Sequence, residues 1–441
     1  MKTLFHDLTV VDVEKRRVLP HTDITVENGI ITDISPSGAG EKKKADKIYK
    51  LSGRFASPGL INLHAHLFGT GRPSKALGAG KTQERLLKFI ATPIGKRVMN
   101  VIVAFSAKTQ LRSGVTTLRT SGDMVGSDLA LKKKVSAGKG GARGLRLIVP
   151  GYALTVPGGH GDGTFAKTGR TPDELVKLVD EAAAAGADYI KICITGGVMD
   201  SKKRGEPGEV RMSAEEVKAV CDRAHELGKK VAAHAQSPEG VRIAALNGVD
   251  TIEHGAPADE ESIAAIKARG GAMVVTYSPA LPLAALSPEI TKLGDTARYN
   301  SGVVLRGMTK GAHKFSAAGV KVGIGTDASC PFCTQYGTWR EAVYFKNAMG
   351  VSREKALYTA TLGNAEVLGL EKVTGSIAVG KSADFMLLKD NPLDDLSALG
   401  KPQKVVAGGR IVSSFGLRRN KKIEEILDKL TEDVQWAKII Y

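Results

Sequence analysis

A chain of 441 residues with 42% hydrophobic and 25% charged residues has the composition of a soluble globular protein, long enough for one very large domain or for two to three ordinary ones. Its net charge of +17 is spread along the chain, without helix–turn–helix or zinc-finger spacing, so we expect a solvated basic surface that attracts anionic substrates rather than a nucleic-acid site. Four cysteines argue against a disulfide scaffold, and no run approaches the ~18 apolar residues that a membrane helix needs.

The beginning of the chain does not resemble a signal peptide, because His6 and Asp7 interrupt its short apolar stretch. We therefore expect a cytoplasmic protein. We also expect a homo-oligomer whose partner in function is a small molecule or a dipeptide, with neither nucleic acid nor a membrane as a partner.

Short strands are predicted at both ends of the chain. Alternating apolar residues predict strands at 8–13, 23–27 and 30–34, and again at 384–388, 404–407 and 410–413. A helix is predicted at 352–368, and an amphipathic helix at 421–437. We expect residues 1–55 and 370–415 to build one small β domain and residues 416–441 to form a helical tail.

Between these ends, strands and helices alternate. Thr171 to Glu174 and Ser213 to Glu216 are capping boxes, which predict helices that begin there and end near Gly186 and Gly228. The predicted strands are 60–64, 115–120, 145–152, 188–195, 230–235, 250–254, 272–277 and 320–327. Eight such units over residues 56–369 predict an α/β fold of the (β/α)8 barrel type. An open doubly wound sheet is the alternative, which the lack of an early G-x-G-x-x-G motif disfavours.

His64 and His66 lie two apart at the end of a predicted strand, where both imidazoles share one face and can bind one metal ion. An H-x-H pair also arises by chance, and a buried structural pair is the plain alternative.

Lys191 is predicted to point into the barrel with Tyr189 and Cys193, whereas Ile190, Ile192 and Ile194 face the helices. A buried ammonium group is costly without a partner. Two explanations remain open: an ion pair with an inward carboxylate, or a carbamate formed with carbon dioxide that bridges metal ions.

His234 and His254 end successive predicted strands, twenty residues apart, and Asp327 ends the eighth. Each has a plain alternative, such as a helix cap for Asp327. Together with the H-x-H pair and Lys191, they would meet at the carboxyl ends of the strands, where barrel enzymes have their active sites.

These segments resemble the amidohydrolase superfamily. The resemblance rests on residues 56–66 (ASPGLINLHAH), 189–191 (YIK), 231–234 (VAAH), 251–254 (TIEH), 325–327 (GTD) and 375–384 (GSIAVGKSAD). It extends over residues 1–415 and implies a distorted (β/α)8 barrel with a β-sandwich made from both chain ends. It further implies two divalent metal ions, usually zinc.

The resemblance also implies a role for each ligand. His64, His66 and Asp327 would hold one ion and His234 and His254 the other, with carboxylated Lys191 between them. A hydroxide that bridges the ions would attack an amide carbonyl, and Asp327 would carry its proton to the leaving nitrogen.

Residues 158–162 (GGHGD) and 192–198 (ICITGGV) look most like the branch of Xaa-Pro and Xaa-Arg/Lys dipeptidases, with ochratoxinase-type amidases and imidazolonepropionases as relatives. In that branch, His160 would contact the substrate or stabilise the oxyanion. Tyr277 and Arg211 are further substrate-binding candidates, with a wall of the barrel mouth and a surface position as their plain alternatives. Hydrolysis of a cyclic or xenobiotic amide is the second functional prediction.

Cys330 and Cys333 have C-x-x-C spacing, which can bind zinc or support redox chemistry. Because no second such motif and no thioredoxin-like context accompanies them, we expect them only to shape the pocket beside Asp327.

Overall fold

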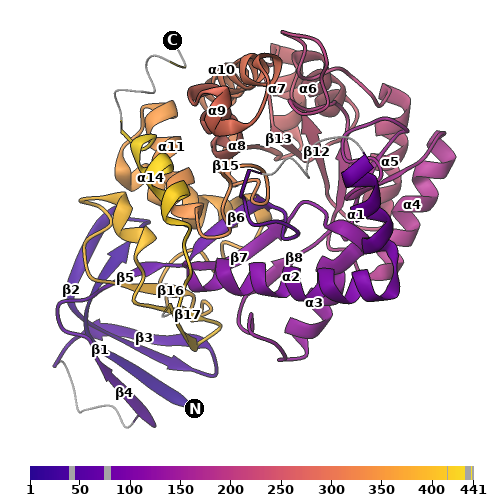
Figure 1. Cartoon of the computed structure of the whole chain (residues 1–441). Coiled ribbons are helices and arrows are strands. Elements are labelled where there is room, and N and C mark those ends of the chain that lie inside the picture. Colours follow the sequence, from indigo (N-terminus) through magenta and orange to yellow (C-terminus); the bar gives the residue numbers. More distant parts are fainter. Residues whose placement is uncertain (39–44, 74–80, 415, 433–438, 440–441) are drawn as a thin grey trace.

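Strands from both ends of the chain form one mixed sheet in the computed structural model, which describes residues 1–38, 45–73, 81–414, 416–432 and 439 (Figure 1). Its order is β18-β17-β16-β5-β1-β2-β3, with β4 paired to β1. The strands are β1 (Lys2–Asp12), β2 (Arg17–Glu27), β3 (Ile30–Pro36), β4 (Lys47–Lys50), β5 (Phe55–Pro58), β16 (Phe385–Leu388), β17 (Lys404–Ala407) and β18 (Arg410–Ser413). Phe5 and Phe385 meet edge to face at 5.0 Å in its core, so residues far apart in sequence stabilise it together.

The remaining strands form two parallel sheets. One has the order β6-β7-β8, and the other β10-β9-β11-β12-β13-β14-β15. Their bounds are β6 (Leu60–Ala65), β7 (Val115–Thr120), β8 (Arg146–Ile148), β9 (Ala153–Thr155), β10 (Ala166–Thr168), β11 (Ile190–Cys193), β12 (Val231–Ala235), β13 (Thr251–His254), β14 (Ala272–Val275) and β15 (Lys321–Ile324). The fold is therefore a mixed α/β fold with parallel sheets, as the alternating pattern predicts.

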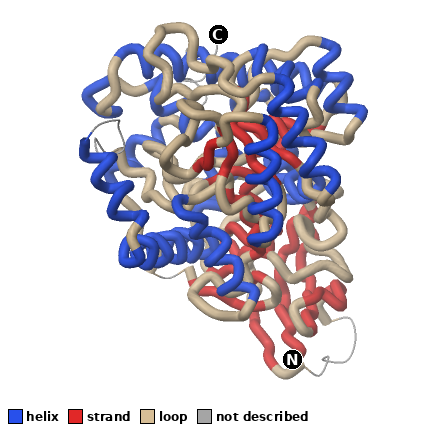
Figure 2. The backbone as a smooth tube through the Cα atoms, turned by 90° about the vertical axis from the view of Figure 1, so that its right-hand side faces the viewer, coloured by secondary structure: helices blue, strands red, loops and turns tan. Residues whose placement is uncertain are grey.

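Helices surround the parallel strands, whereas the mixed sheet extends beyond them (Figure 2). The helices are α1 (Lys81–Ala91), α2 (Pro93–Arg112), α3 (Ser127–Ser136), α4 (Pro172–Ala185), α5 (Ala214–Glu226), α6 (Pro238–Leu246), α7 (Glu260–Ala268), α8 (Tyr277–Ala285), α9 (Pro288–Thr291), α10 (Asp295–Ala317), α11 (Thr338–Met349), α12 (Arg353–Tyr358), α13 (Asn364–Leu368) and α14 (Lys421–Lys429).

Two helix starts are confirmed in detail. Thr171 accepts a hydrogen bond from the amide of Glu174, and Ser213 and Glu216 form a reciprocal capping box. Three predicted elements differ from the structure. The helix predicted at 352–368 is interrupted by a π-helical segment at 359–363. The tail helix ends at Lys429, and residues 433–437 lie outside the described part of the chain. Strand β14 ends at Val275, so Tyr277 begins α8.

Within the described residues, no single helix is long and apolar enough to span a membrane. The bent pair formed by residues 84–91 and 93–112, at 96° to each other, passes that test only when the two helices are taken together and only by length and composition.

The two parallel sheets meet along β6 and the segment after β15. The carbonyl oxygen of His64 accepts hydrogen bonds from the amides of Thr326 at 2.9 Å and Asp327 at 2.8 Å. Glycine is required at position 325, because a Cβ there would lie 2.4 Å from the Cβ of His64. A second contact between the two parallel sheets joins the residue after β8 to the segment before β11, where the amide of Asp188 donates to the carbonyl of Val149 at 2.8 Å.

The side chain of Asn364 also joins β6 to β15 by hydrogen bonds. Its amide nitrogen donates to the carbonyls of Ile61 at 2.7 Å and Ile324 at 2.9 Å, and its oxygen accepts from the amide of Ile324 at 3.0 Å. Because Asn364 is fully buried, solvent water could not form these hydrogen bonds with the backbone if the side chain were removed.

We predict that Asn364→Ala lowers the free energy of unfolding by about 3 kcal/mol, because three buried hydrogen bonds to the backbone are lost. Urea denaturation followed by circular dichroism measures the loss. The control is Asn247→Ala, which removes one side-chain hydrogen bond at the half-buried end of α6 and should cost about 1 kcal/mol or less. Equal losses in the two variants would contradict the role of Asn364.

Candidate metal centre and active site

The six predicted metal ligands meet at the carboxyl ends of parallel strands. All six line one cavity with an empty volume of ≈ 830 Å³, its open mouth included. They are His64 and His66 at the end of β6, Lys191 in β11, His234 in β12, His254 at the end of β13 and Asp327 after β15. The convergence follows from the parallel strands, whose carboxyl ends share one edge of the sheet.

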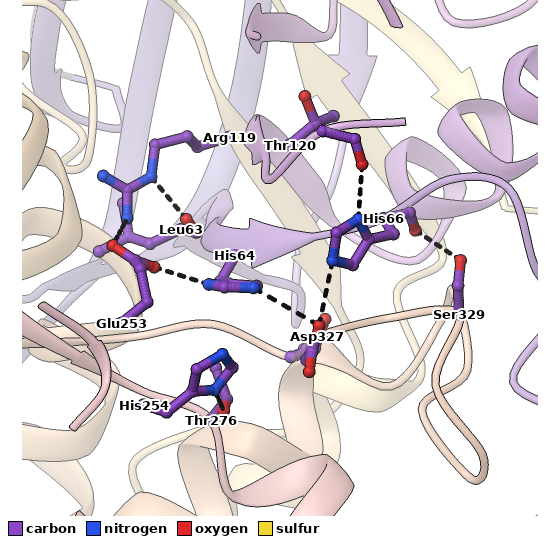
Figure 3. A network of polar contacts seen from close by, with 12 residues as sticks. Leu63, His64, His66, Arg119, Thr120, Glu253, His254, Thr276, Asp327 and Ser329 are labelled. Atoms are coloured by element: carbon purple, nitrogen blue, oxygen red, sulfur yellow. Dashed lines mark hydrogen bonds and ion pairs between the residues drawn. The ribbon is translucent and has the colours of Figure 1, made fainter. Parts of the chain in front are cut away.

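His64, His66 and Asp327 form the tightest group. The Nε2 atoms of His64 and His66 lie 3.4 Å and 3.5 Å from Oδ1 of Asp327 (Figure 3). One ligand atom from each of the three buried residues lies within 4.8 Å of the others. This spacing suits three ligands of a single metal ion.

The hydrogen bonds of the two imidazoles set their ligand atoms. Nδ1 of His64 lies 2.6 Å from the Glu253 carboxylate, and Nδ1 of His66 lies 2.6 Å from the carbonyl oxygen of Gly122. Both partners only accept, so each Nδ1 carries the proton and each Nε2 presents a lone pair. The Nε2 lone pairs of His64 and His66 then face the carboxylate of Asp327 and repel it. A cation bound between the three groups would remove this repulsion. This donor set therefore fits a divalent metal ion.

Arg119 and Glu253 lie behind His64 and were not predicted. Nη2 of Arg119 lies 2.6 Å from Glu253, and its Nε donates to the carbonyl of Leu63 at 2.6 Å (Figure 3). Burial acts to raise the pKa of Glu253, but Arg119 and His64 outweigh it and hold the pKa well below its usual range. Arg119 thus keeps Glu253 ionised, and Glu253 fixes the orientation of His64.

The backbone bends sharply at two of the ligands. His254 has φ of 63° and Asp327 has φ of 51°, the left-handed region that L side chains rarely adopt. Neighbouring residues of a regular strand point to opposite faces. The bend at His254 lets both Glu253 and His254 contact His64, one by a hydrogen bond and the other with ring centroids 4.8 Å apart.

A second group of imidazoles lies beside the first. The rings of His234 and His254 are 4.5 Å apart, and His160 stacks on His234 at 4.2 Å. Nδ1 of His254 lies 2.7 Å from Oγ1 of Thr276, and Nε2 of His234 lies 3.2 Å from the carbonyl of Gly196. Because that carbonyl requires a proton on Nε2, His234 keeps its Nδ1 lone pair available as a ligand.

Burial favours the neutral form of His66, His234 and His254. It lowers the pKa of His66 to about 4 and, together with the neighbouring imidazoles, lowers the pKa of His234 and of His254 well below the usual value. Burial acts to raise the pKa of Asp327, but the surrounding His64, His254 and His66 side chains hold that pKa well below the usual range. Neutral imidazoles and an ionised carboxylate are the protonation states that metal ligands need.

Lys191 is buried at 2% exposure, and its Nζ has no hydrogen-bond partner among the described residues. Burial lowers the pKa of this amine. The ion pair considered from the sequence is not present in the described part of the chain. An unpartnered amine with a lowered pKa fits chemical modification by carbon dioxide, since only a neutral amine reacts and the product is an anion.

His160 lies on a loop at the edge of the cavity and is held by a partner that sequence reasoning missed. Its Nδ1 lies 2.5 Å from Asp200, which also accepts the amide hydrogen of Gly197 at 2.9 Å. Burial acts to raise the pKa of Asp200, but the hydrogen bond and charge of His160 lower it overall. Since Asp200 accepts at Nδ1, Nε2 of His160 remains available to a ligand in the cavity.

The rest of the cavity wall is mainly apolar. Lining side chains other than the six ligands and His160 include Phe68, Phe165, Val198, Met199, Pro279, Ala280, Leu283, Val304 and Pro331. The Phe68 and Phe165 rings are nearly parallel, at 6.2 Å and 16°. Among the described lining residues, Asp327 is the only carboxylate and Lys191 the only Lys or Arg.

The other predicted substrate-binding residues do not line the cavity. Tyr277 is fully buried at the start of α8, because β14 ends before it. Arg211 pairs with Glu209 at 2.9 Å in a loop outside the lining. Cys330 does line the cavity, whereas Cys333 does not, and burial raises the pKa of both thiols.

Comparison with known proteins begins with a family model. The model described as the amidohydrolase family matches residues 55–412. Among solved structures, a candidate prolidase from Bifidobacterium longum has 35% identity and a TM-score of 0.84, covering 98% of this chain and 99% of that one. A Xaa-Pro dipeptidase with methionine in its active site has 28% identity and a TM-score of 0.79, covering 94% and 100%.

Curated relatives widen the range of chemistry. The ochratoxinase of Aspergillus niger is 25% identical over 342 residues, which are 70% of this chain and 67% of that protein. A 5-methylthioadenosine/S-adenosylhomocysteine deaminase of Bacillus cereus (strain 03BB102) is 25% identical over 419 residues, covering 88% and 85%.

We predict that Glu253→Gln lowers the free energy of unfolding by about 3–5 kcal/mol, because Arg119 loses the carboxylate that balances its buried charge. Thermal and urea denaturation measure this. Glu209→Gln breaks the exposed pair with Arg211 and should cost less than about 1 kcal/mol. If Glu253→Gln were as stable as Glu209→Gln, the buried pair would not have the role described above.

Proposed function

The chain belongs to the amidohydrolase family, and on that premise we propose that it hydrolyses the amide or peptide bond of a small substrate whose side chain is apolar. A dipeptide of the Xaa-Pro type or an N-acyl amino acid is the preferred substrate. The observation that carries the proposal is a set of six metal-ligating side chains at one end of a cavity whose remaining wall is mainly apolar.

We propose that two divalent ions, zinc in the first instance, occupy this centre. His64, His66 and Asp327 would hold one ion and His234 and His254 the other, with Lys191 as the bridging carbamate. Bound ions of this kind acidify water and polarise a carbonyl group. The parallel sheets would then correspond to the (β/α)8 barrel of the family, and the mixed sheet to its β-sandwich.

The side chains of this chain supply the proton transfer and the orientation of the substrate. The Asp327 carboxylate, ionised in the resting state, accepts the proton of the attacking water and returns it to the leaving nitrogen. His160, oriented by Asp200 at Nδ1, presents Nε2 to the cavity, where it contacts and orients the substrate. The apolar wall binds the side chain and excludes water from the reacting bond.

The lining argues against a basic side chain in the substrate. A lysine or arginine side chain would enter a wall whose only described carboxylate is Asp327, itself a proposed metal ligand. A cation without a partner in such a wall is strongly disfavoured. This observation favours the Xaa-Pro preference over the Xaa-Arg/Lys preference.

A second candidate is hydrolysis of an amide that carries a planar ring, as in a cyclic or xenobiotic amide. The nearly parallel Phe68 and Phe165 rings favour it, because an aromatic group packs well against such faces.

We predict that Lys191→Ala loses bound metal and activity together, each by more than about 100-fold. Elemental analysis and a hydrolysis assay measure the two losses, and ¹³C NMR after growth with ¹³C-bicarbonate reports the carbamate. The control is Lys132→Ala, which removes a partly exposed lysine paired with Asp188 and should change neither quantity. Full activity with unchanged metal content in Lys191→Ala would contradict the bridging role.

We predict that zinc-loaded protein cleaves Leu-Pro or N-acetyl-leucine with a kcat/KM at least about 10-fold above that for Leu-Arg, because the apolar wall offers arginine no partner. Chromatography of the released amino acid gives the rates. Preferential cleavage of Leu-Arg would overturn the substrate preference. Release of ammonia from a nucleoside, with none of the amides cleaved, would overturn the proposed reaction.

A further inference from the structure

Helices α1 and α2 present large apolar side chains to solvent. Val101 is 70% exposed, Ile94 67% and Phe105 62%. We name the α1–α2 apolar surface after its six members, which are Leu86, Phe89, Ile94, Val98, Val101 and Phe105. Single exposed apolar residues are common on protein surfaces, whereas six large ones on two helices that contact each other favour an interaction site.

The opposite face of α2 is already packed in the core of the molecule. Met99, Val103, Ala107 and Leu111 are buried there, and Figure 1 shows α2 as a long helix at the outside of the fold, next to α3. A surface helix normally has one apolar face and one polar face. Because α2 has apolar residues on its inner face and on its outer face, its sequence is typical of a helix that packs against other parts of a structure on both sides.

The spacing of the outer residues is that of a helix-packing seam. Ile94, Val98, Val101 and Phe105 follow one another at intervals of four, three and four residues, the heptad pattern of helices that pack together. This series reads the same in both directions. An antiparallel copy of α2 would therefore place an apolar residue opposite each member, Ile94 against Phe105 and Val98 against Val101.

We propose that the α1–α2 apolar surface binds the same surface of a second copy of this chain around a two-fold axis. Such a contact is isologous, so one self-complementary patch serves both subunits. The proposal does not depend on the proposed hydrolysis, because none of the six residues lines the cavity.

The available area matches what a stable dimer needs. With about 150–250 Å² for a large aromatic side chain and less for an aliphatic one, the six partly exposed residues leave at most about 600 Å² on each copy. Complete burial on two copies would then cover up to about 1,200 Å² from these side chains, the lower bound of specific protein interfaces, before polar neighbours are counted.

An anionic membrane is the strongest rival occupant, because Arg85, Lys88, Lys96 and Arg97 lie exposed on the same helices. The residue types favour a second copy. Helices that lie on membranes present mainly Trp, Phe and Leu to the lipid. Three of the six members of the surface are Phe or Leu and none is Trp, whereas the other three, all on α2, are Ile or Val. Branched side chains of this kind are typical of packed helix seams.

Sedimentation velocity of the full chain, with and without Val101→Glu plus Phe105→Glu, tests the proposal. The native chain should sediment with the mass of two copies or of a larger even number of copies. The double variant should lose the contact and give a lower mass, with dissociation at least about 100-fold easier, because a charge then lies buried in the seam. Circular dichroism and thermal unfolding verify that the variant is folded.

Two further variants keep the test sharp. Val379→Glu changes an apolar residue that is 61% exposed outside the surface, and it should keep the native mass. Ile94→Lys at the end of the seam is a milder change if the double variant does not fold, and it should also weaken the contact. A native chain that sediments as one copy, or a folded double variant that keeps the native mass, would overturn the proposal. Flotation of a single-copy native chain with phosphatidylserine vesicles would assign the surface to a membrane instead.

Discussion

One backbone contact determines both the fold and the site. The amides of Thr326 and Asp327 donate to the carbonyl of His64, which joins the edges of the two parallel sheets. The same contact sets Asp327 beside the imidazoles of His64 and His66, at 3.4–3.5 Å. The left-handed backbone at Asp327 turns the carboxylate inward at this point. Because the junction and the ligand group share their atoms, neither can shift without the other.

Only some of the buried charged groups around this contact have a partner of opposite charge among the described residues. Arg119 and Glu253 neutralise each other in a buried pair, and Glu253 also orients His64. Lys191 and Asp327 are buried as well, but Lys191 has no partner among the described residues. Turning Lys191 into an anion would place two buried anions, the carbamate and Asp327, among the imidazoles. The proposed binuclear centre would give both anions cationic partners, which the side chains alone do not supply.

Strand periodicity was enough to predict from the sequence that the six candidate metal ligands lie together, because parallel strands place their carboxyl ends at one edge. It could not find Glu253, since a regular strand would point it away from the face of His254. It could not find Asp200 either, because that residue meets His160 through loops forty residues apart. Tyr277 was assigned to a strand end, but β14 ends two residues earlier, and the chain turns into a helix there.

Part of the cavity wall comes from elements other than those that carry the predicted ligands. Helix α8 carries Ala280 and Leu283 into the lining, and its first amides, those of Tyr277 and Ser278, donate to the carboxylate of Glu341 at 2.6 Å and 2.9 Å. Glu341 comes from α11 and acts as the cap that α8 lacks at its own N-terminus. Residues of α8 can therefore change the preference for a substrate side chain without moving His64 or Asp327. The part of the wall formed by α8 is thus positioned independently of the predicted metal ligands His64 and Asp327.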